Sequence, residues 1–355
     1  MQATAAPRGH VRHSRYRRTF RVGHLRDLHV LRWLVPSALG IGAVLALVLA
    51  IDPAHFASAI AHLNLLLLPA IVAVSIAYYV IQGIRWHFLL VDVGIRMRLR
   101  DVVLITLAGQ ATSFLPLGEL TRAILVTQAS GGEFGAAVAA ETVQELLYTV
   151  ILIAFAVPGL LAVPHALAGI VVILFAIAAI IVAMTWCRMY RYLRLLVSKT
   201  PLLRRVLHPL DELHNDLVVL MRKPGTITWS WLSVLQAAAM VTTLWLVAQA
   251  VAPGHLDWKS AALVYAVSNV AGLLSLIPAG VGAYEGSIIG LLVGFGLNPG
   301  VAAAIAVLQR VLNQGIATGV GFAAYGVARR RLHVGGLGTL TVRSAGRGTP
   351  ADAAA

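Results

Sequence analysis

Six ionisable residues stand inside stretches of this sequence that are otherwise apolar. An ionised side chain at the centre of a bilayer costs about 2.5–3.5 kcal/mol on insertion scales, so each of them needs a physical reason to be there. Arginine presents a planar fork of N–H donors that suits a phosphate, whereas a carboxylate suits a cationic group or a proton. The predicted substrate-binding residues are Glu119, Arg122, Glu141, Glu145, Glu285 and Arg310.

The spacing of these residues predicts ion pairs. Glu141 and Glu145 are four residues apart and therefore share one face of a helix. Two carboxylates on one face repel each other unless they are protonated or paired. Arg122 and Arg310 are the candidate partners for both carboxylates. The alternative is that all these charges form buried salt bridges that only fix the geometry of the helices.

Two of the apolar segments, residues 102–128 and 260–297, contain Pro and Gly near their middle. Both residue types interrupt a helix. A helix that restarts after such a break exposes free N–H groups at its new N-terminus, and these groups attract an anion. Together with the two arginines, the breaks predict a site for a phosphate-bearing headgroup. The predicted helix-break residues are Pro116, Gly118, Pro278, Gly280 and Gly282.

The composition is that of a membrane protein. Of the 355 residues, 59% are hydrophobic and 12% are charged, whereas a soluble domain has about 25% charged residues. The net charge of +14 is concentrated in blocks between apolar stretches, which argues against nucleic acid as a partner and is typical of helical membrane proteins. A single cysteine, Cys187, and histidines without ligand spacing predict no metal site and no cofactor.

Apolar runs of about 20 residues are long enough to cross a bilayer as helices. Together with the two broken segments, which we interpret as hairpins, these runs predict an all-α polytopic membrane protein with six full spans, or up to eight if the hairpins cross. The first hairpin is too short to cross twice and is expected to be re-entrant, whereas the second could be either. The predicted full spans are 33–51, 64–84, 135–157, 166–187, 228–252 and 301–327.

The basic residues set the orientation. All of the 28 lysines and arginines except Arg122, Lys259 and Arg310 fall in or next to the two tails and in the 85–100 and 188–227 loops. The first of these loops is predicted to begin with Arg85. Because basic loops stay in the cytoplasm, both termini are predicted to be cytoplasmic in a multi-pass protein of the plasma (inner) membrane.

The predicted organisation is a disordered basic tail, one transmembrane domain and a second disordered tail, at residues 1–31, 32–330 and 331–355. Residues 33–157 and 166–327 show the same order of spans and hairpin but begin on opposite sides of the membrane. Inverted repeats of this kind are a transporter architecture, although any chain with an even number of spans can be divided in this way. The 188–227 loop carries a leucine stripe that predicts an amphipathic helix.

The segments around the two breaks resemble a known family. The first comprises residues 115–122 and 141–145, and the second comprises residues 277–286 and 308–310. Both are similar to motifs of the lysylphosphatidylglycerol synthase transmembrane-region family, also called flippase-like, which includes hopanoid-biosynthesis-associated membrane proteins. The resemblance covers roughly residues 33–330.

One position departs from the family's pattern. The family commonly has Glu-Arg-x-x-Asp where this chain has Thr142 in place of the arginine and Glu145 in place of the aspartate. The change removes one charge from the membrane segment. It therefore weakens the transfer of any particular substrate from the family to this chain.

The resemblance implies flippase-like translocation of a phospholipid or a lipid-linked intermediate, with anionic or phosphate-bearing membrane lipids as partners. It does not imply aminoacyl transfer, because that activity belongs to a separate soluble domain. The sequence contains no catalytic or donor-binding motif, so no catalytic residues are predicted. Three alternatives stay open: an ion-coupled carrier of small solutes, a membrane enzyme that modifies lipid or envelope glycan, and an assembly partner of such enzymes.

Overall fold

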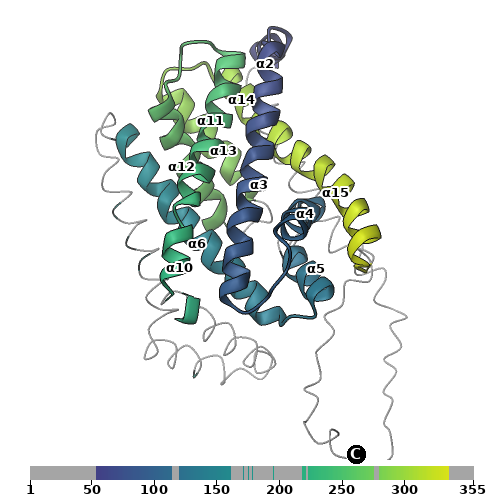
Figure 1. Ribbon diagram of the computed structural model, residues 1–355. Helices are drawn as coiled ribbons and strands as arrows, with labels where there is room; N and C mark the ends of the chain where they lie inside the picture. The colour runs from purple at the N-terminus through teal and green to yellow at the C-terminus, as the bar shows by residue number, and fades with distance from the viewer. Residues whose placement is uncertain are drawn as a thin grey trace, which may run out of the picture. The chain divides into compact units, whose positions relative to one another are not determined.

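The computed structural model describes residues 53–113, 120–160, 218–220, 223–275 and 280–335, with isolated helical positions between 171 and 195. All of these residues belong to one compact unit, which spans residues 40–355. Within the described ranges the secondary structure is helical and contains no strand. The predicted all-α fold is confirmed (Figure 1).

The first half contains two long helices that flank a hairpin of short ones. The hairpin arms, α4 and α5, pack against each other, and α4 also packs against the preceding long helix, α3. Each arm is 11 residues long, and its length of about 16 Å is short for a crossing of about 30 Å. The helices are α2 (Pro53–Ala61), α3 (Leu68–Asp92), α4 (Leu99–Gly109), α5 (Leu120–Ser130) and α6 (Phe134–Leu160).

The second half has the same order of a long helix, two shorter ones and a long helix. Its hairpin arms, α12 and α13, also pack against each other. The last long helix is α14 continued by α15, with a single π-helical turn, Val311–Gly315, between them. The helices are α10 (Pro224–Trp229), α11 (Leu232–Val251), α12 (Trp258–Leu274), α13 (Ala283–Gly294), α14 (Pro299–Arg310) and α15 (Ile316–Leu332).

Four of the predicted spans are confirmed as helices that are long and apolar enough to cross a membrane. They correspond to Leu65–Asp92, Phe134–Leu160, Leu232–Val251 and Pro299–Leu332. The predicted spans at 33–51 and 166–187 lie almost wholly outside the described residues, as do most of the 188–227 loop and the tail at 1–31. The protein is therefore an all-α polytopic membrane protein.

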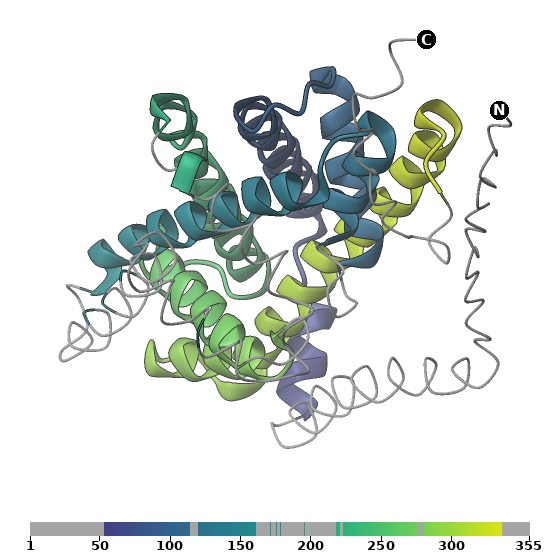
Figure 2. The ribbon, with the colours of Figure 1, turned by 90° about the horizontal axis from the view of Figure 1, so that it is seen from below.

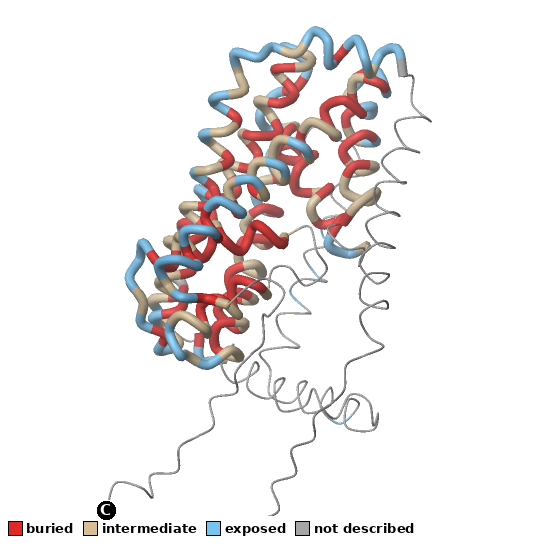
Figure 3. The backbone as a smooth tube through the Cα atoms, turned by 90° about the vertical axis from the view of Figure 1, so that its right-hand side faces the viewer, coloured by how far each residue is buried: buried red, intermediate tan, exposed pale blue. Residues whose placement is uncertain are grey.

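Helices of the first half pack against helices of the second half, so the two halves do not form separate bundles. Helix α6, teal in Figure 2, packs against α12, and α3 packs against α11. Helix α15, yellow in Figure 1, packs against α4 of the first hairpin. Buried and exposed positions alternate along many of the helices, as expected when one face packs inward (Figure 3). The first hairpin therefore lies against long helices from both halves.

One close approach depends on a glycine. A Cβ atom added to Gly321 of α15 would overlap the backbone N of Ala111, which belongs to the turn that follows α4. Because any side chain would meet this backbone, only glycine lets the two chain segments approach so closely. This contact fixes the last long helix against the first hairpin.

Two boundaries differ from the sequence-based prediction. The assignment of Arg85 to a loop is wrong, because α3 continues to Asp92 and buries Arg85 completely. At the other end, α15 continues to Leu332, and both backbone groups of Gly335 form hydrogen bonds with side chains of the helices before it. Residues 331–335, which the sequence placed in the tail, thus belong to the helical unit.

The break of the second hairpin is visible at its glycines. Gly280 and Gly282 have φ angles of 63° and 88°, which L-residues with a side chain rarely adopt. Helix α13 begins directly after Gly282. The other predicted break residues, Pro116, Gly118 and Pro278, lie outside the described residues.

Candidate functional site

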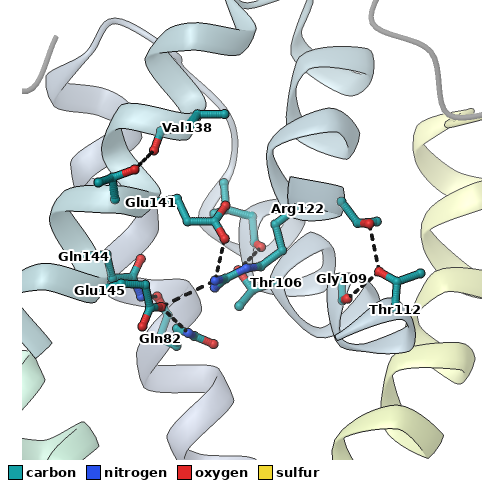
Figure 4. Close-up of polar contacts among 12 residues, drawn as sticks. Gln82, Thr106, Gly109, Thr112, Arg122, Val138, Glu141, Gln144 and Glu145 are labelled. Carbon is teal, nitrogen blue, oxygen red and sulfur yellow. Dashed lines mark hydrogen bonds and ion pairs between the residues drawn. The ribbon is translucent and has the colours of Figure 1, made fainter. Parts of the chain in front are cut away.

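The first group of charges lies where the first hairpin meets α6. Arg122 is the third residue of α5 and donates from Nη2 to Glu141 Oε1 at 2.7 Å. The same nitrogen lies 3.5 Å from Glu145 Oε1 (Figure 4). Glu145 also accepts a hydrogen bond from Gln82 Nε2 on α3. The predicted pairing of Arg122 with both carboxylates is therefore present.

The local packing holds Arg122 in this position. A Cβ atom on Gly109 would overlap Arg122 Cγ, so the aliphatic part of the arginine occupies the space above that glycine. The Thr112 hydroxyl donates to the Thr121 hydroxyl at 2.8 Å and links the turn that follows α4 to α5. The Trp86 ring centre lies 5.7 Å from the guanidinium carbon of Arg122, within the range of a cation–π contact.

Arg85 belongs to the same group, although sequence reasoning missed it. Its Nη1 donates to the Gln144 carbonyl oxygen at 2.9 Å and to Gln236 Oε1 at 3.4 Å. Among the described residues, its Nε and Nη2 have no hydrogen-bond partner. A signal was present in the sequence, because the apolar run does not end at Arg85 but continues through residues 86–91. We call Arg85, Arg122, Glu141 and Glu145 the first charge cluster.

The second group of charges joins the second hairpin to α14. Glu285 is the third residue of α13, and its Oε1 accepts a hydrogen bond from Arg310 Nε at the end of α14. The other carboxylate oxygen accepts from the backbone N–H of Gly282 at 2.7 Å. The broken helix therefore uses one of its free N–H groups to hold its own carboxylate. We call Glu285 and Arg310 the second charge pair.

Arg310 also contacts an aromatic ring and borders the π-helical turn. Its guanidinium carbon lies 5.2 Å from the Tyr284 ring centre. In the turn that follows, Asn313 accepts a hydrogen bond from the Tyr79 hydroxyl, and Gln314 Nε2 donates to Ser113 Oγ at 2.6 Å. Single π turns inside α-helices occur frequently at functional sites. This turn connects the second charge pair to the first hairpin, just beyond α4.

The structure thus brings most of the predicted residues into two groups. Arg122 pairs with Glu141 and Glu145 as predicted, whereas Arg310, the other candidate partner, forms its ion pair with Glu285. Glu119 lies outside the described residues. Within the described part of the chain, no three His, Cys, Asp or Glu side chains gather in a way that could hold a metal ion.

Comparison with known proteins identifies the family to which the chain belongs. Residues 33–321 match the family model described as the lysylphosphatidylglycerol synthase TM region. A search of curated proteins finds no significant match. The region matched by the family model contains both hairpins and both groups of charges. On this match and the apolar helices, the chain is a membrane-embedded protein that belongs to the lysylphosphatidylglycerol synthase transmembrane-region family.

Proposed function

We propose that this protein translocates lipids with phosphate-bearing headgroups across the membrane, in the manner of a flippase and without aminoacyl transfer. The observation that carries the proposal is the pair of buried ionic groups, one on each hairpin. A headgroup that crosses the membrane must be held by polar groups, because the hydrocarbon interior offers none. Arg122 and Glu285 both occupy the third position of the second arm of their hairpin, and both are buried.

The arginines of the two groups differ in their exposure, and therefore in how accessible they are to a headgroup. The Arg122 side chain is 3% exposed, whereas the Arg310 side chain is 22% exposed. A guanidinium carries five N–H donors in a planar fork, so an arginine can bind a phosphate while it keeps a carboxylate partner. Arg310 is the more accessible of the two arginines and reaches Glu285 through Nε. We assign phosphate binding to Arg310 and a supporting role to Arg122.

We further propose that the membrane is the plasma (inner) membrane and that both termini face the cytoplasm. Helices α4 and α15 pack side by side, and near the start of one and the end of the other Arg331 Nη2 lies 3.2 Å from Asp101 Oδ1. The exposed arginines 96, 98 and 100 therefore lie at the same end as arginines 329–331. A concentration of arginines at one end of a helical membrane protein is typical of its cytoplasmic side.

Lipid movement in reconstituted vesicles tests the proposal. The purified protein is placed in vesicles of a phosphate-free galactolipid that contain a small fraction of one phospholipid, and a membrane-impermeant reagent modifies the headgroups in the outer leaflet. Complete modification is expected with the wild-type chain, and only the outer half without it. Arg310→Gln should slow the movement by about tenfold or more, since a hydrogen bond to a charged group contributes about 1.5–3 kcal/mol.

Arg330→Gln is the matched control, because it removes the same charge from an exposed position near the end of α15. It should leave the rate of lipid movement unchanged. The proposal is wrong if no phospholipid moves with correctly folded wild-type protein. It is also wrong if Arg310→Gln and Arg330→Gln have equal effects.

A further inference from the structure

Three hydrogen bonds lock α3 and α6 together beside Glu145. Arg85 Nη1 on α3 donates to the Gln144 carbonyl oxygen on α6 at 2.9 Å. In the opposite direction, Gln144 Nε2 donates to the Gln82 carbonyl oxygen at 3.2 Å. The Gln82 side chain in turn donates to Glu145 Oε1, also at 3.2 Å (Figure 4). The guanidinium of Arg85 is therefore held against the turn of α6 that carries Glu145.

Arg85 is completely buried in this lock, and its described hydrogen-bond partners, Gln144 and Gln236, are both neutral. Its Nε and Nη2 are enclosed by protein and have no hydrogen-bond partner among the described residues. A buried charge without an opposite charge is costly, and a buried donor is normally satisfied. The two spare donors of Arg85 therefore indicate a second partner, which reaches them in another arrangement of the same helices.

Glu145 has the properties that this second partner requires. Its charge acts on Arg85 from the neighbouring helix. Its Oε1 accepts from Gln82 and lies 3.5 Å from Arg122 Nη2, whereas its Oε2 has no partner within the described part of the chain. The Glu145 side chain is 36% exposed and therefore less confined than Glu141, which is 7% exposed and lies 2.7 Å from Arg122. Glu145 is thus the carboxylate of the cluster that can turn from one guanidinium to the other.

We propose that Glu145 exchanges Arg122 for Arg85 during lipid translocation, which makes Arg85 a positioning residue. The inference rests on the proposed function and specifies how the first hairpin is released. Paired with Arg122, Glu145 ties α6 to α5 of the hairpin, and paired with Arg85 it ties α6 to α3 instead. Exchange of one ion pair for another avoids the cost of a bare charge in a low-dielectric interior. It therefore provides two arrangements between which a transporter can alternate.

A double-mutant cycle with two readouts tests the exchange. Arg85→Gln, Glu145→Gln and the double variant are compared with wild type for unfolding in detergent and for lipid movement in the galactolipid vesicles. Each single variant should slow lipid movement about tenfold, because each removes one side of a charge-assisted pair, and the double variant should be no slower than the slower single one. In the unfolding constant, the two changes should be coupled by no more than about threefold. Equal coupling in both readouts would mean a static contact and would overturn the proposal.

Glu133→Gln is the matched control, because it makes the same chemical change at an exposed position just before α6. Combined with Arg85→Gln, it should leave the rate of the Arg85 variant unchanged. Arg85→Lys replaces Arg85→Gln if that variant does not fold. It keeps the charge but offers one nitrogen in place of three, so it should slow lipid movement less, with coupling to Glu145→Gln in the same direction. Coupling to Glu133→Gln as large as that to Glu145→Gln would contradict the exchange.

A stability measurement that needs no lipid separates the exchange from the proposed function. Arg122→Gln, or Arg122→Lys if the former does not fold, removes or shortens the present partner of Glu145. The coupling between Arg85→Gln and Glu145→Gln in the unfolding constant should then be about tenfold larger than in the wild-type background. If no lipid moves but this increase is observed, the exchange stands and the proposed function falls. If lipid moves and the coupling is equal in both backgrounds, the exchange is overturned while the proposed function stands.

Discussion

The two hairpins place charges at equivalent positions but with opposite sign. In the first, the third residue of the second arm is a cation, Arg122, whose carboxylate partners lie on the following helix. In the second, that residue is an anion, Glu285, and its arginine partner lies on the following helix. Both hairpin residues are deeply buried, and the accessible member of each group, Glu145 or Arg310, belongs to the following helix.

This difference in burial indicates that the hairpin charges have a supporting role and that their accessible partners have a binding role. A buried charge on a hairpin arm is fixed by its surroundings, as Arg122 is by Gly109 and Glu285 is by the Gly282 N–H. The accessible partner on the following helix is less enclosed by the described structure. We therefore expect loss of a hairpin charge to act mainly on stability, and loss of an accessible partner to act mainly on transport.

The largest expected effect is on stability at the first hairpin. Arg122→Gln removes the ion-pair partner that the described structure shows for Glu141 and Glu145. Removal of one partner from a buried pair costs about 3–5 kcal/mol. Arg310→Gln should cost less, because its side chain is 22% exposed. Thermal unfolding in one detergent compares the two variants. Equal losses of stability would contradict the division of roles between buried and accessible charges.

The next effect concerns the contact between α15 and the first hairpin. Gly321→Ala places a methyl group against the backbone of Ala111, and overpacking of this kind costs about 1–3 kcal/mol. Gly319→Ala is the matched control, since a Cβ there meets nothing within 4 Å. That variant should be neutral or stabilised by up to about 1 kcal/mol, because alanine favours a helix more than glycine does.

The unfolding free energies of Gly321→Ala and Gly319→Ala are measured and compared with that of the wild-type protein. If Gly321→Ala is as stable as Gly319→Ala, the close approach of α15 to the first hairpin is incorrect. The second hairpin also has a close approach of its own, between Gly272 of α12 and Gly280 just before α13.

A smaller effect is expected from the hydrogen bond that links the π-helical turn to the first hairpin. Gln314→Leu removes the donor to Ser113 Oγ, and a neutral hydrogen bond contributes about 0.5–1.5 kcal/mol. A double-mutant cycle with Ser113→Ala isolates this contribution. A coupling energy near zero would show that the hydrogen bond between Gln314 and Ser113 does not stabilise the folded protein.

An effect of similar size concerns the first arms of the hairpins. Asp257 caps α12 by accepting a hydrogen bond from the Ser260 N–H at 3.0 Å, whereas α4 has no side-chain cap. Hydrogen bonds from the Ser260 side chain and backbone lower the pKa of Asp257 from its usual 3.8. A carboxyl group whose pKa is lower in the folded state stabilises that state above its unfolded pKa and loses this contribution as the pH falls.

Asp257→Ala should therefore cost about 1 kcal/mol near pH 7, and the difference from wild type should shrink as the pH falls through and below 3.8. Unfolding curves at several pH values measure it. Asp257→Asn separates the charge from the cap, because asparagine also caps a helix. A difference between wild type and Asp257→Ala that does not depend on pH would contradict the assignment.

Much of the architecture follows from the sequence alone. Length and hydropathy suffice to predict the four described long helices, because a bilayer of fixed thickness requires a minimum apolar run. Pro and Gly suffice to predict where α12 and α13 separate, since Gly280 and Gly282 occupy backbone conformations that favour glycine. The pairing of Arg122 with Glu141 was one of the predicted alternatives, and it forms between helices that are adjacent in the chain.

The burial of individual charged side chains is known only from the tertiary structure. In the sequence, Arg85 resembles the start of a basic loop, and only its contacts with Gln144 and Gln236, on helices far along the chain, show that it is buried. Likewise, no sequence pattern distinguishes Glu145 from Glu141, yet one side chain is 36% exposed and the other 7%. Apolar periodicity reports a local property of each helix, whereas burial and charge balance depend on which helices pack together.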